Sequence, residues 1–294
     1  MVDSLPRQTR LKLDQTLAQW RHWQCQPALA AAPLIERRLS GGLSNHSVLV
    51  ASAEQRFVVR MDGIEPATHG LNRQTEWRVL QEAGRQQLAP APRYFNPDLG
   101  TLVCDYLPAD AQQPGNLEDV ADLLRKIHEL PAIHSRLDLR ERVLRYERHL
   151  EAQGTRTALK SFHPIILHLI ETCAQQCATR VVCHNDLLRP NRLYCANKLR
   201  ALDWEYTAMA SPWYELAVIA AGDSLNNTEL DQLLVRYLRR EASAGERQWV
   251  HAYTCVYRYL ELLWYLAAAP ALSTSEFLEQ KTAELERALG GSPG

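Results

Sequence analysis

The chain has 294 residues, of which 46% are hydrophobic and 23% are charged, and its formal net charge is −1. This length is enough for a large core, in one two-lobed unit or in two domains. Because nucleic-acid binders show basic patches or stripes, the balanced charge argues against a nucleic-acid partner. No run approaches the roughly 18 uncharged apolar residues of a spanning helix, so we expect no membrane span.

The seven cysteines are odd in number and form no C-x-x-C pair. This usage favours reduced, mostly buried thiols in a cytoplasmic protein. The first residues include several charges and no apolar stretch, so we expect no signal peptide. The spacing of Leu11, Leu13, Leu17 and Trp20 predicts an N-terminal helix ahead of the first lobe.

Three strand-like runs follow, at Ile35–Leu39, Ser47–Val50 and Phe57–Arg60. Small residues fill the turn between the first two runs: Ser40, Gly41, Gly42, Leu43, Ser44 and Asn45. Glycines let a backbone approach phosphates closely, where its N–H groups can donate. An ordinary hairpin turn is the alternative. The chain contains no P-loop string.

The third strand ends at Arg60, and Glu76 lies in a segment, 72–83, with the apolar spacing of an amphipathic helix. In the kinase template, a strand Lys on the nucleotide phosphates is held by a helix Glu. Arg60 and Glu76 match these positions in type and order. Arg can also neutralise phosphate, although it is not equivalent to Lys. The alternative is a solvated surface pair.

Residues 93–105 carry a hairpin signature with a turn at 96–100. Residues 104–108, at the end of this hairpin, are expected to form a hinge between two lobes. The backbone groups of Asp105 and Leu107 are natural partners there for a nucleotide base.

Most later segments have helical periodicity. The run 136–148 interleaves five arginines with acidic residues, which favours a solvated helix face. A broad apolar stripe runs from Ala158 to Cys173 despite Pro164 and predicts one helix. A further leucine pattern predicts a helix near 230–238. The glycine-rich end, 290–294, is expected to be flexible.

The most informative stretch is Val181–Asn191, followed by Leu202–Glu205. Asp186 precedes Asn191 by five positions, and Asp203 follows a predicted hairpin. In a kinase site, the first Asp takes the proton of the substrate hydroxyl, and the Asn and the second Asp hold Mg²⁺. Mg²⁺ prefers such oxygen ligands. The pattern predicts phosphoryl transfer from a nucleotide to an alcohol.

Three late aromatics, Tyr253, Tyr257 and Trp264, fall on one face of a predicted helix. Aromatic faces attract quaternary ammonium groups by cation–π interaction. Aromatic surface near the predicted metal site is added by Trp204, Trp213 and Tyr214, and Glu205 offers a carboxylate to a cationic substrate. The alternatives are a core stripe for the aromatics and a salt bridge within its own lobe for Glu205.

These pieces together resemble the aminoglycoside phosphotransferase and choline kinase superfamily, from about residue 34 to 267. The nucleotide loop 39–45, the helix segment 123–128 and the segments 202–206 and 212–217 carry the resemblance. The last two resemble the choline and ethanolamine kinase branch, and Arg at position 60 is in keeping with that branch. Glu215 stands where that family more often has Asp. A longer carboxylate can still cap a helix or hold the catalytic loop.

The resemblance implies an α+β, protein-kinase-like fold with a small β-rich N-lobe and a larger, mainly helical C-lobe. We expect a helical extension over 1–33, a nucleotide-binding lobe and hinge over 34–107, a catalytic and substrate-binding lobe over 108–289 and a tail over 290–294. It implies ATP and Mg²⁺, with Asp186 as base and with Asn191 and Asp203 as metal ligands. The nucleotide site would use the loop residues Ser40, Gly41, Gly42, Ser44 and Asn45 with Arg60, Glu76, Asp105 and Leu107.

The leading functional hypothesis is an ATP-dependent kinase of a small cationic alcohol such as choline or ethanolamine. The substrate site would use Trp204, Glu205, Tyr257 and Trp264. Thiamine kinase and aminoglycoside phosphotransferase are alternatives in the same class. A nucleotide-binding pseudokinase is an alternative of another class, and a helical interaction protein with an accidental motif is a third. The oligomeric state is left open.

Overall fold

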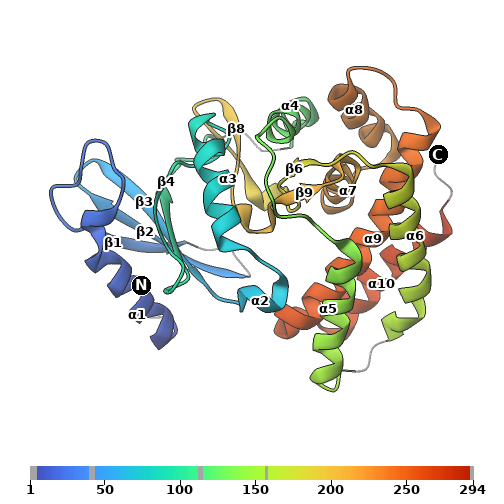
Figure 1. Ribbon diagram of the computed structural model, residues 1–294, viewed down its shortest axis with the longest axis horizontal. Helices are drawn as coiled ribbons and strands as arrows, with labels where there is room; N and C mark the ends of the chain where they lie inside the picture. Colours follow the sequence, from blue (N-terminus) through green and yellow to red (C-terminus); the bar gives the residue numbers. More distant parts are fainter. Residues whose placement is uncertain (1–4, 40–43, 112–114, 156–157, 292–294) are drawn as a thin grey trace.

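A computed structural model describes residues 5–39, 44–111, 115–155 and 158–291. The chain forms two lobes, a sheet-based N-lobe and a larger helical C-lobe (Figure 1). This arrangement confirms the predicted fold class. No helix in these described ranges is both long and apolar enough to cross a lipid bilayer.

The N-lobe is built on a five-stranded antiparallel sheet in the order β1-β2-β3-β5-β4. The strands are β1 (Leu34–Leu39), β2 (Asn45–Ser52), β3 (Gln55–Asp62), β4 (Pro92–Asn96) and β5 (Thr101–Asp105). Residues alternate between the two faces of a strand, so Phe57, Val59 and Met61 share one face of β3. That face is buried against Leu13 of α1 (Arg7–Ala18). The predicted N-terminal helix therefore covers the sheet.

Helix α3 (Arg73–Arg85) connects the sheet with the C-lobe, where it contacts the short turn η4 (Trp204–Tyr206). Asn72 caps the helix by accepting a hydrogen bond from the backbone N–H of Thr75, which satisfies one of the free donors of the first turn. Its buried face carries Leu80 and Ala83, as the sequence pattern predicted, and also Glu76. Trp77, of the same pattern, is half-buried. The short helix α2 (Pro66–His69) precedes it.

The C-lobe is mainly helical, and its helix α7 is buried along almost its whole length. The helices are α4 (Leu117–His128), α5 (Leu139–Ala152), α6 (His163–Gln176), α7 (Pro212–Gly222), α8 (Asn227–Leu238), α9 (Ala244–Ala268) and α10 (Ser275–Gly290). The longest, α9, contacts α5, α6, α7 and α10, and Figure 1 shows it beside them. This helix therefore forms the axis of the lobe.

The single helix predicted over 158–173 is wrong. Ala158–Phe162 forms a separate 3-10 turn, η2, and α6 begins at His163 with Pro164 in its first turn. Proline lacks the N–H that a helix interior needs, and its ring clashes with the carbonyl four residues earlier. As a result the apolar stripe is broken, and Ile165 is 44% exposed.

Candidate active site

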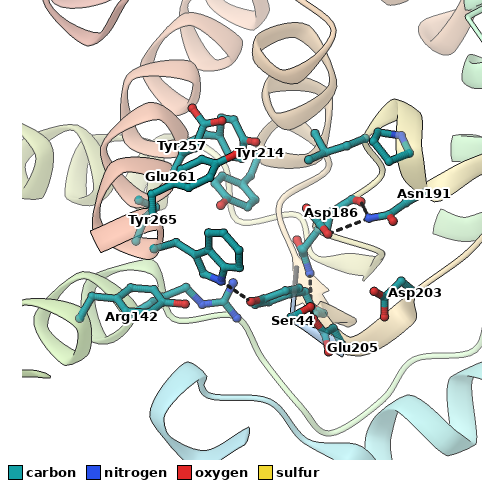
Figure 2. A pocket seen from close by; sticks show the side chains of 17 residues that line it. Ser44, Arg142, Asp186, Asn191, Asp203, Glu205, Tyr214, Tyr257, Glu261 and Tyr265 are labelled. Atoms are coloured by element: carbon teal, nitrogen blue, oxygen red, sulfur yellow. Dashed lines mark hydrogen bonds between the residues drawn. The ribbon is translucent and has the colours of Figure 1, made fainter. Parts of the chain in front are cut away.

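The catalytic loop starts from a buried strand. β6 (Val181–Cys183) pairs antiparallel with β9 (Ala208–Ala210), and the loop follows directly. The side-chain amide of Asn191 donates to the backbone carbonyl and to Oδ2 of Asp186, both at 2.8 Å. The loop therefore holds the predicted base and the predicted metal-binding amide in direct contact (Figure 2).

A hairpin returns the second aspartate to this loop. Strands β7 (Arg192–Cys195) and β8 (Lys198–Ala201) pair antiparallel, as the sequence pattern predicted. The N–H of Leu202 donates to the carbonyl of Asn191 at 2.8 Å. Asp203 comes next, in the left-handed backbone region with a φ of 57°, which is uncommon for a residue other than glycine. The hairpin thus brings Asp203 back to Asn191.

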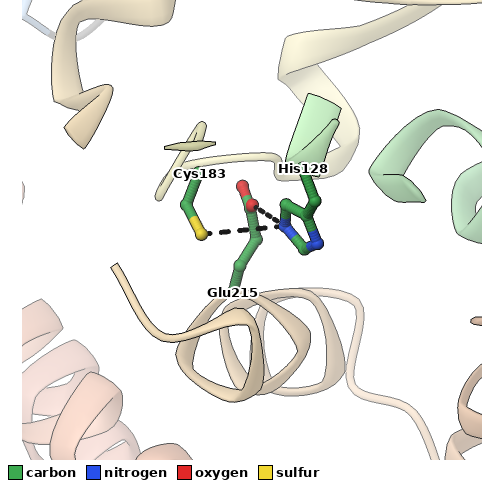
Figure 3. A group of neighbouring side chains, drawn as sticks. All are labelled: His128, Cys183 and Glu215. Atoms are coloured by element: carbon green, nitrogen blue, oxygen red, sulfur yellow. Dashed lines mark hydrogen bonds and ion pairs between the residues drawn. The ribbon is translucent and has the colours of Figure 1, made fainter. Parts of the chain in front are cut away.

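Glu215, on α7, holds the catalytic loop through a backbone hydrogen bond. One carboxylate oxygen accepts the backbone N–H of Asn185 at 2.9 Å, and the other lies 2.7 Å from Nε2 of His128. The thiol of Cys183 lies 3.7 Å from the same nitrogen (Figure 3). Burial alone would raise the pKa of Glu215, but the contact with His128 holds it below its ordinary value. The longer carboxylate thus holds the loop, which is one of the two roles expected of it.

Arg60 joins the sheet, α3 and the metal-site sequence. Its guanidinium lies 2.5 Å from Oε1 of Glu76 and 2.8 Å from Oδ1 of Asp203. The Arg60 and Glu76 side chains are only 11% and 3% exposed, so the surface-pair alternative is wrong. Burial opposes the charge on Arg60, but Glu76 and Asp203 raise its pKa well above the ordinary value. The three charges form one buried group.

A second arginine, Arg73, was not recognised from the sequence. It contacts Asp62 at 2.6 Å, Glu76 at 2.9 Å and Glu205 at 3.0 Å. Its position three residues before Glu76 is a spacing at which helix side chains meet, and this was the available signal. Because Arg73 pairs with acids from both lobes, it extends the buried charge group across the lobe boundary.

Glu205 is already engaged by the N-lobe. Ser44 donates to one carboxylate oxygen and Asn45 to the other, both at 2.9 Å. These residues end the predicted nucleotide loop, whose members Ser40, Gly41 and Gly42 lie outside the described residues. Glu205 also forms a salt bridge with Arg73 at 3.0 Å. Because Arg73 lies in the N-lobe, the alternative of a salt bridge within the lobe of Glu205 is wrong about where the partner lies.

Two cavities meet at the catalytic loop. The interlobe cavity has a volume of about 450 Å³ and the acceptor-side cavity about 260 Å³. The first is lined by residues including Arg60, Glu76, Asp105, Leu107 and Trp204. The second is lined by residues including Ser44, Asp186, Glu205, Tyr257 and Trp264. Pro190, Asn191 and Asp203 line both, so the predicted metal ligands stand at the junction.

Some predicted residues have other contacts. Arg93 binds the carboxylate of Asp105 through two nitrogens, at 2.6 and 2.7 Å. The side chain of Asp105 is therefore occupied by Arg93, although the residue lines the interlobe cavity. Trp204 is buried, packs against His184 and donates to the carbonyl of Ala201. It lines the interlobe cavity and does not line the acceptor-side cavity, contrary to its expected substrate role.

The aromatic stripe divides between cavity and core. Tyr257 and Trp264 line the acceptor-side cavity, whereas Tyr253 is buried against Tyr214 with ring centroids 5.8 Å apart. Tyr214, which was expected to add aromatic surface near the metal site, also lines the cavity, and three further tyrosines were not recognised from the sequence: Tyr146, Tyr206 and Tyr265. They come from three separate parts of the chain, so no single helical pattern contains them. The cavity wall is largely aromatic (Figure 2).

The basic run also contributes to this cavity. Arg142, on α5, lines it and lies with its guanidinium carbon 5.2 Å from the centre of the Tyr206 ring. The prediction of a wholly solvated face for residues 136–148 is therefore wrong at this position. A helix turns its side chains through about 100° per residue, so one residue of a charged run can face inward.

The predicted base lies in an unusual electrostatic setting. Burial raises the pKa of Asp186 well above its ordinary value, and the carboxylates of Asp203 and Glu205 raise it further. Burial and Glu205 likewise raise the pKa of Asp203 to about 7. Buried groups with like-charged neighbours disfavour ionisation. The site therefore concentrates negative charge that a bound cation would offset.

Most of the chain matches one family of known proteins. The model of the family described as "Phosphotransferase enzyme family" matches residues 35–253. The chain belongs to this family. It is therefore a phosphotransferase, and the resemblance drawn from the sequence is confirmed. The curated protein LicA of Haemophilus influenzae is 31% identical over 87 residues, which are 29% of this chain and 33% of that protein. The match thus spans about a third of that relative's length.

Solved structures share the whole fold. A choline/ethanolamine kinase family protein from Mesorhizobium loti superposes with a TM-score of 0.74 at 20% identity, covering 95% of each chain. The choline kinase LicA of Streptococcus pneumoniae has a TM-score of 0.73 at 20% identity, covering 86% of this chain and 94% of that one. A gentamicin-bound aminoglycoside phosphotransferase superposes with a TM-score of 0.60 at 15% identity, covering 97% of each chain. The kinase-like fold is therefore common to all of them.

The Arg60 contacts predict a large effect on stability. Arg60→Ala removes the shared partner of the buried carboxylate of Glu76 and the partly exposed carboxylate of Asp203, and breaking a buried pair costs about 3–5 kcal/mol. The free energy of unfolding, measured in urea, should fall by about that amount. Arg56→Ala is the matched control on the same strand, because Arg56 is 59% exposed in its pair with Glu36. Equal losses in both variants would contradict the assignment.

The Glu215 contacts predict a local effect on the loop. Glu215→Ala leaves the Asn185 N–H unsatisfied, which costs about 1–3 kcal/mol. Hydrogen exchange should become faster at residues 184–191, whereas the exposed control Glu279→Gln should leave it unchanged. Unchanged protection in Glu215→Ala would show that other contacts hold the loop.

Proposed function

We propose that the protein transfers the γ-phosphoryl group of ATP to the hydroxyl of a small cationic alcohol of the choline or ethanolamine kind. The observation that carries this proposal is the junction of the two cavities. Asp186 faces the acceptor-side cavity, while Asn191 and Asp203 line both. A nucleotide in one cavity and an alcohol in the other would meet at these side chains.

The interlobe cavity suits the nucleotide. Residues 104–107 line it, and Leu107 follows the two N–H groups of Asp105 and Tyr106 that donate within the N-lobe. The remaining backbone groups of this segment would pair with a base. Arg60, held by Glu76, lies where it can neutralise phosphate. A solved LicA complex contains AMP and a spectinomycin phosphotransferase complex contains ADP, which supports nucleotide binding by the shared fold.

Asn191 and Asp203 would hold Mg²⁺, which prefers carboxylate and amide oxygens. The raised pKa of Asp203, about 7, fits this role because a cation offsets the crowding of carboxylates. When bound, the metal would neutralise charge on the phosphates. The Arg60 contact at 2.8 Å keeps Asp203 at the junction of the cavities.

In the reaction, Asp186 accepts the proton of the acceptor hydroxyl. The hydroxyl oxygen forms a bond to the γ-phosphorus as the bond from that phosphorus to the bridging oxygen of ADP breaks. Asn191 orients the carboxylate of Asp186 by donating to Oδ2. The raised pKa of Asp186 favours proton acceptance.

The acceptor-side cavity supports a cationic substrate. Tyr257 and Trp264 offer ring faces, and each contact with an ammonium group is worth about 0.5–2 kcal/mol. Glu261 adds a carboxylate to the same wall.

A cytoplasmic location is part of the same proposal. All seven cysteines are free, and six of them are buried. Unpaired thiols are typical of reducing compartments.

Replacement of the base gives the direct test. Asp186→Asn should lower the turnover number by about 10²–10⁴-fold, the usual contribution of a positioned base, and should leave ATP binding intact. The assay measures phosphorylated product from Mg²⁺-ATP with choline, ethanolamine, thiamine and an aminoglycoside in parallel.

The control is Asp98→Asn, which changes an exposed aspartate in the turn between β4 and β5. This variant should retain wild-type turnover. Substantial activity in Asp186→Asn would reject Asp186 as the base. ATP binding without product from any alcohol would favour a regulatory nucleotide-binding protein.

A further inference from the structure

Arg142 is a charged residue of the acceptor-side cavity that the proposed reaction does not use. Among the described residues that line this cavity, it is the one cation beside four carboxylates. We propose that the acceptor carries a carboxylate in addition to its hydroxyl and cationic group, and that Arg142 binds this carboxylate. The proposal rests on the proposed function and narrows its substrate class to zwitterionic amino alcohols.

The guanidinium of Arg142 has hydrogen-bond donors that no described residue uses. Its guanidinium lies over the Tyr206 ring, with the guanidinium carbon 5.2 Å from the ring centre. Within the described part of the chain, the guanidinium N–H groups make neither a hydrogen bond nor an ion pair, and the residue is half-buried. Stacking uses the face of a guanidinium and leaves the N–H groups at its edge, which match a carboxylate in two-pronged geometry.

The other arginines of the same helix are paired. Arg140 lies 2.6 Å from Glu171, and Arg148 lies 2.6 Å from Glu141. Arg142 follows Glu141 directly but points into the cavity, away from this surface network. A half-buried charge without a hydrogen bond or an ion pair is costly. A bound anion would remove this cost.

The position of Arg142 favours an anion on the acceptor. It lines the cavity that contains Asp186 but does not line the interlobe cavity. In Figure 2, Arg142 lies on one side of Asp186, whereas Asp203 lies on the other. A guanidinium serving the phosphates of the nucleotide would be expected beside Arg60, in the interlobe cavity.

Another wall of the same cavity is aromatic and acidic. Helix α9 presents Tyr257, Glu261 and Trp264 to it. Lys281 lies 3.2 Å from one oxygen of Glu261 and offsets part of its charge. The cavity therefore has an aromatic and acidic wall suited to an ammonium group and a separate guanidinium suited to a carboxylate. A purely cationic alcohol would leave the guanidinium unpaired.

Two pairs of compounds isolate the carboxylate. Serine is ethanolamine with a carboxylate on the amine-bearing carbon. Carnitine is choline with a carboxymethyl group on the hydroxyl-bearing carbon. Binding of all four is measured by calorimetry in wild type, in Arg142→Gln and in the control Arg148→Gln, which changes an exposed arginine of the same helix. Turnover with Mg²⁺-ATP is measured separately.

In at least one pair, the wild type should bind the carboxylated compound about tenfold or more tightly than its parent, as expected of a charge-assisted two-pronged contact. Arg142→Gln should abolish this preference and leave the affinity for the parent unchanged. Arg148→Gln should behave as wild type.

The inference would be overturned if the wild type bound both parents as tightly as, or more tightly than, their carboxylated counterparts. Failure of all four compounds to bind would also overturn it. A uniform loss of turnover with every acceptor in Arg142→Gln, with the binding preference unchanged, would also overturn it, because it would assign Arg142 to the phosphoryl group or to Tyr206. Phosphorylation of choline or ethanolamine in these cases would leave the proposed function standing. Carboxylate-selective binding lost in Arg142→Gln, without product from any acceptor, would support the anion site and reject the proposed function.

Discussion

The buried ion pairs of Arg60 hold the site together. This one guanidinium contacts Glu76 of α3 and Asp203 of the C-lobe, so it fixes the strand, the helix and the catalytic segment relative to one another. Buried charges are costly unless they are paired, and removing one partner exposes the full cost of the others. The position of Asp203 at the junction of the two cavities depends on this pairing.

The charge group has an excess of acids. Arg60 and Arg73 together contact four carboxylates: Asp62, Glu76, Asp203 and Glu205. This excess and the burial of the site explain why the pKa of Asp203 rises to about 7. A divalent cation would restore the balance of charge. The arrangement that stabilises the lobe boundary is thus also one that attracts metal, and the proposed chemistry uses the same carboxylates that join the lobes.

The sequence predicted the parts of the site that are local in the chain. The catalytic loop, the β7–β8 hairpin and the α3 helix follow from short patterns, and Asp186, Asn191 and Arg60 lie within them. Arg73 and Arg142 were missed because their roles depend on distant partners: Arg73 meets Glu205 across 132 positions of sequence. A charged helix run has the same periodicity whether a given arginine faces solvent or a cavity. The split of the predicted 158–173 helix reflects a single proline that outweighed the apolar pattern.

The most direct test of the account is a crystal structure with Mg²⁺ and a non-hydrolysable ATP analogue. We expect the nucleotide in the interlobe cavity with its phosphates beside Arg60, and the metal on Asn191 and Asp203. The Arg60–Asp203 distance, 2.8 Å in the structure described above, should lengthen as the metal takes the carboxylate. A nucleotide bound elsewhere, or a metal held by other residues such as His128, Cys183 and Glu215, would contradict the account.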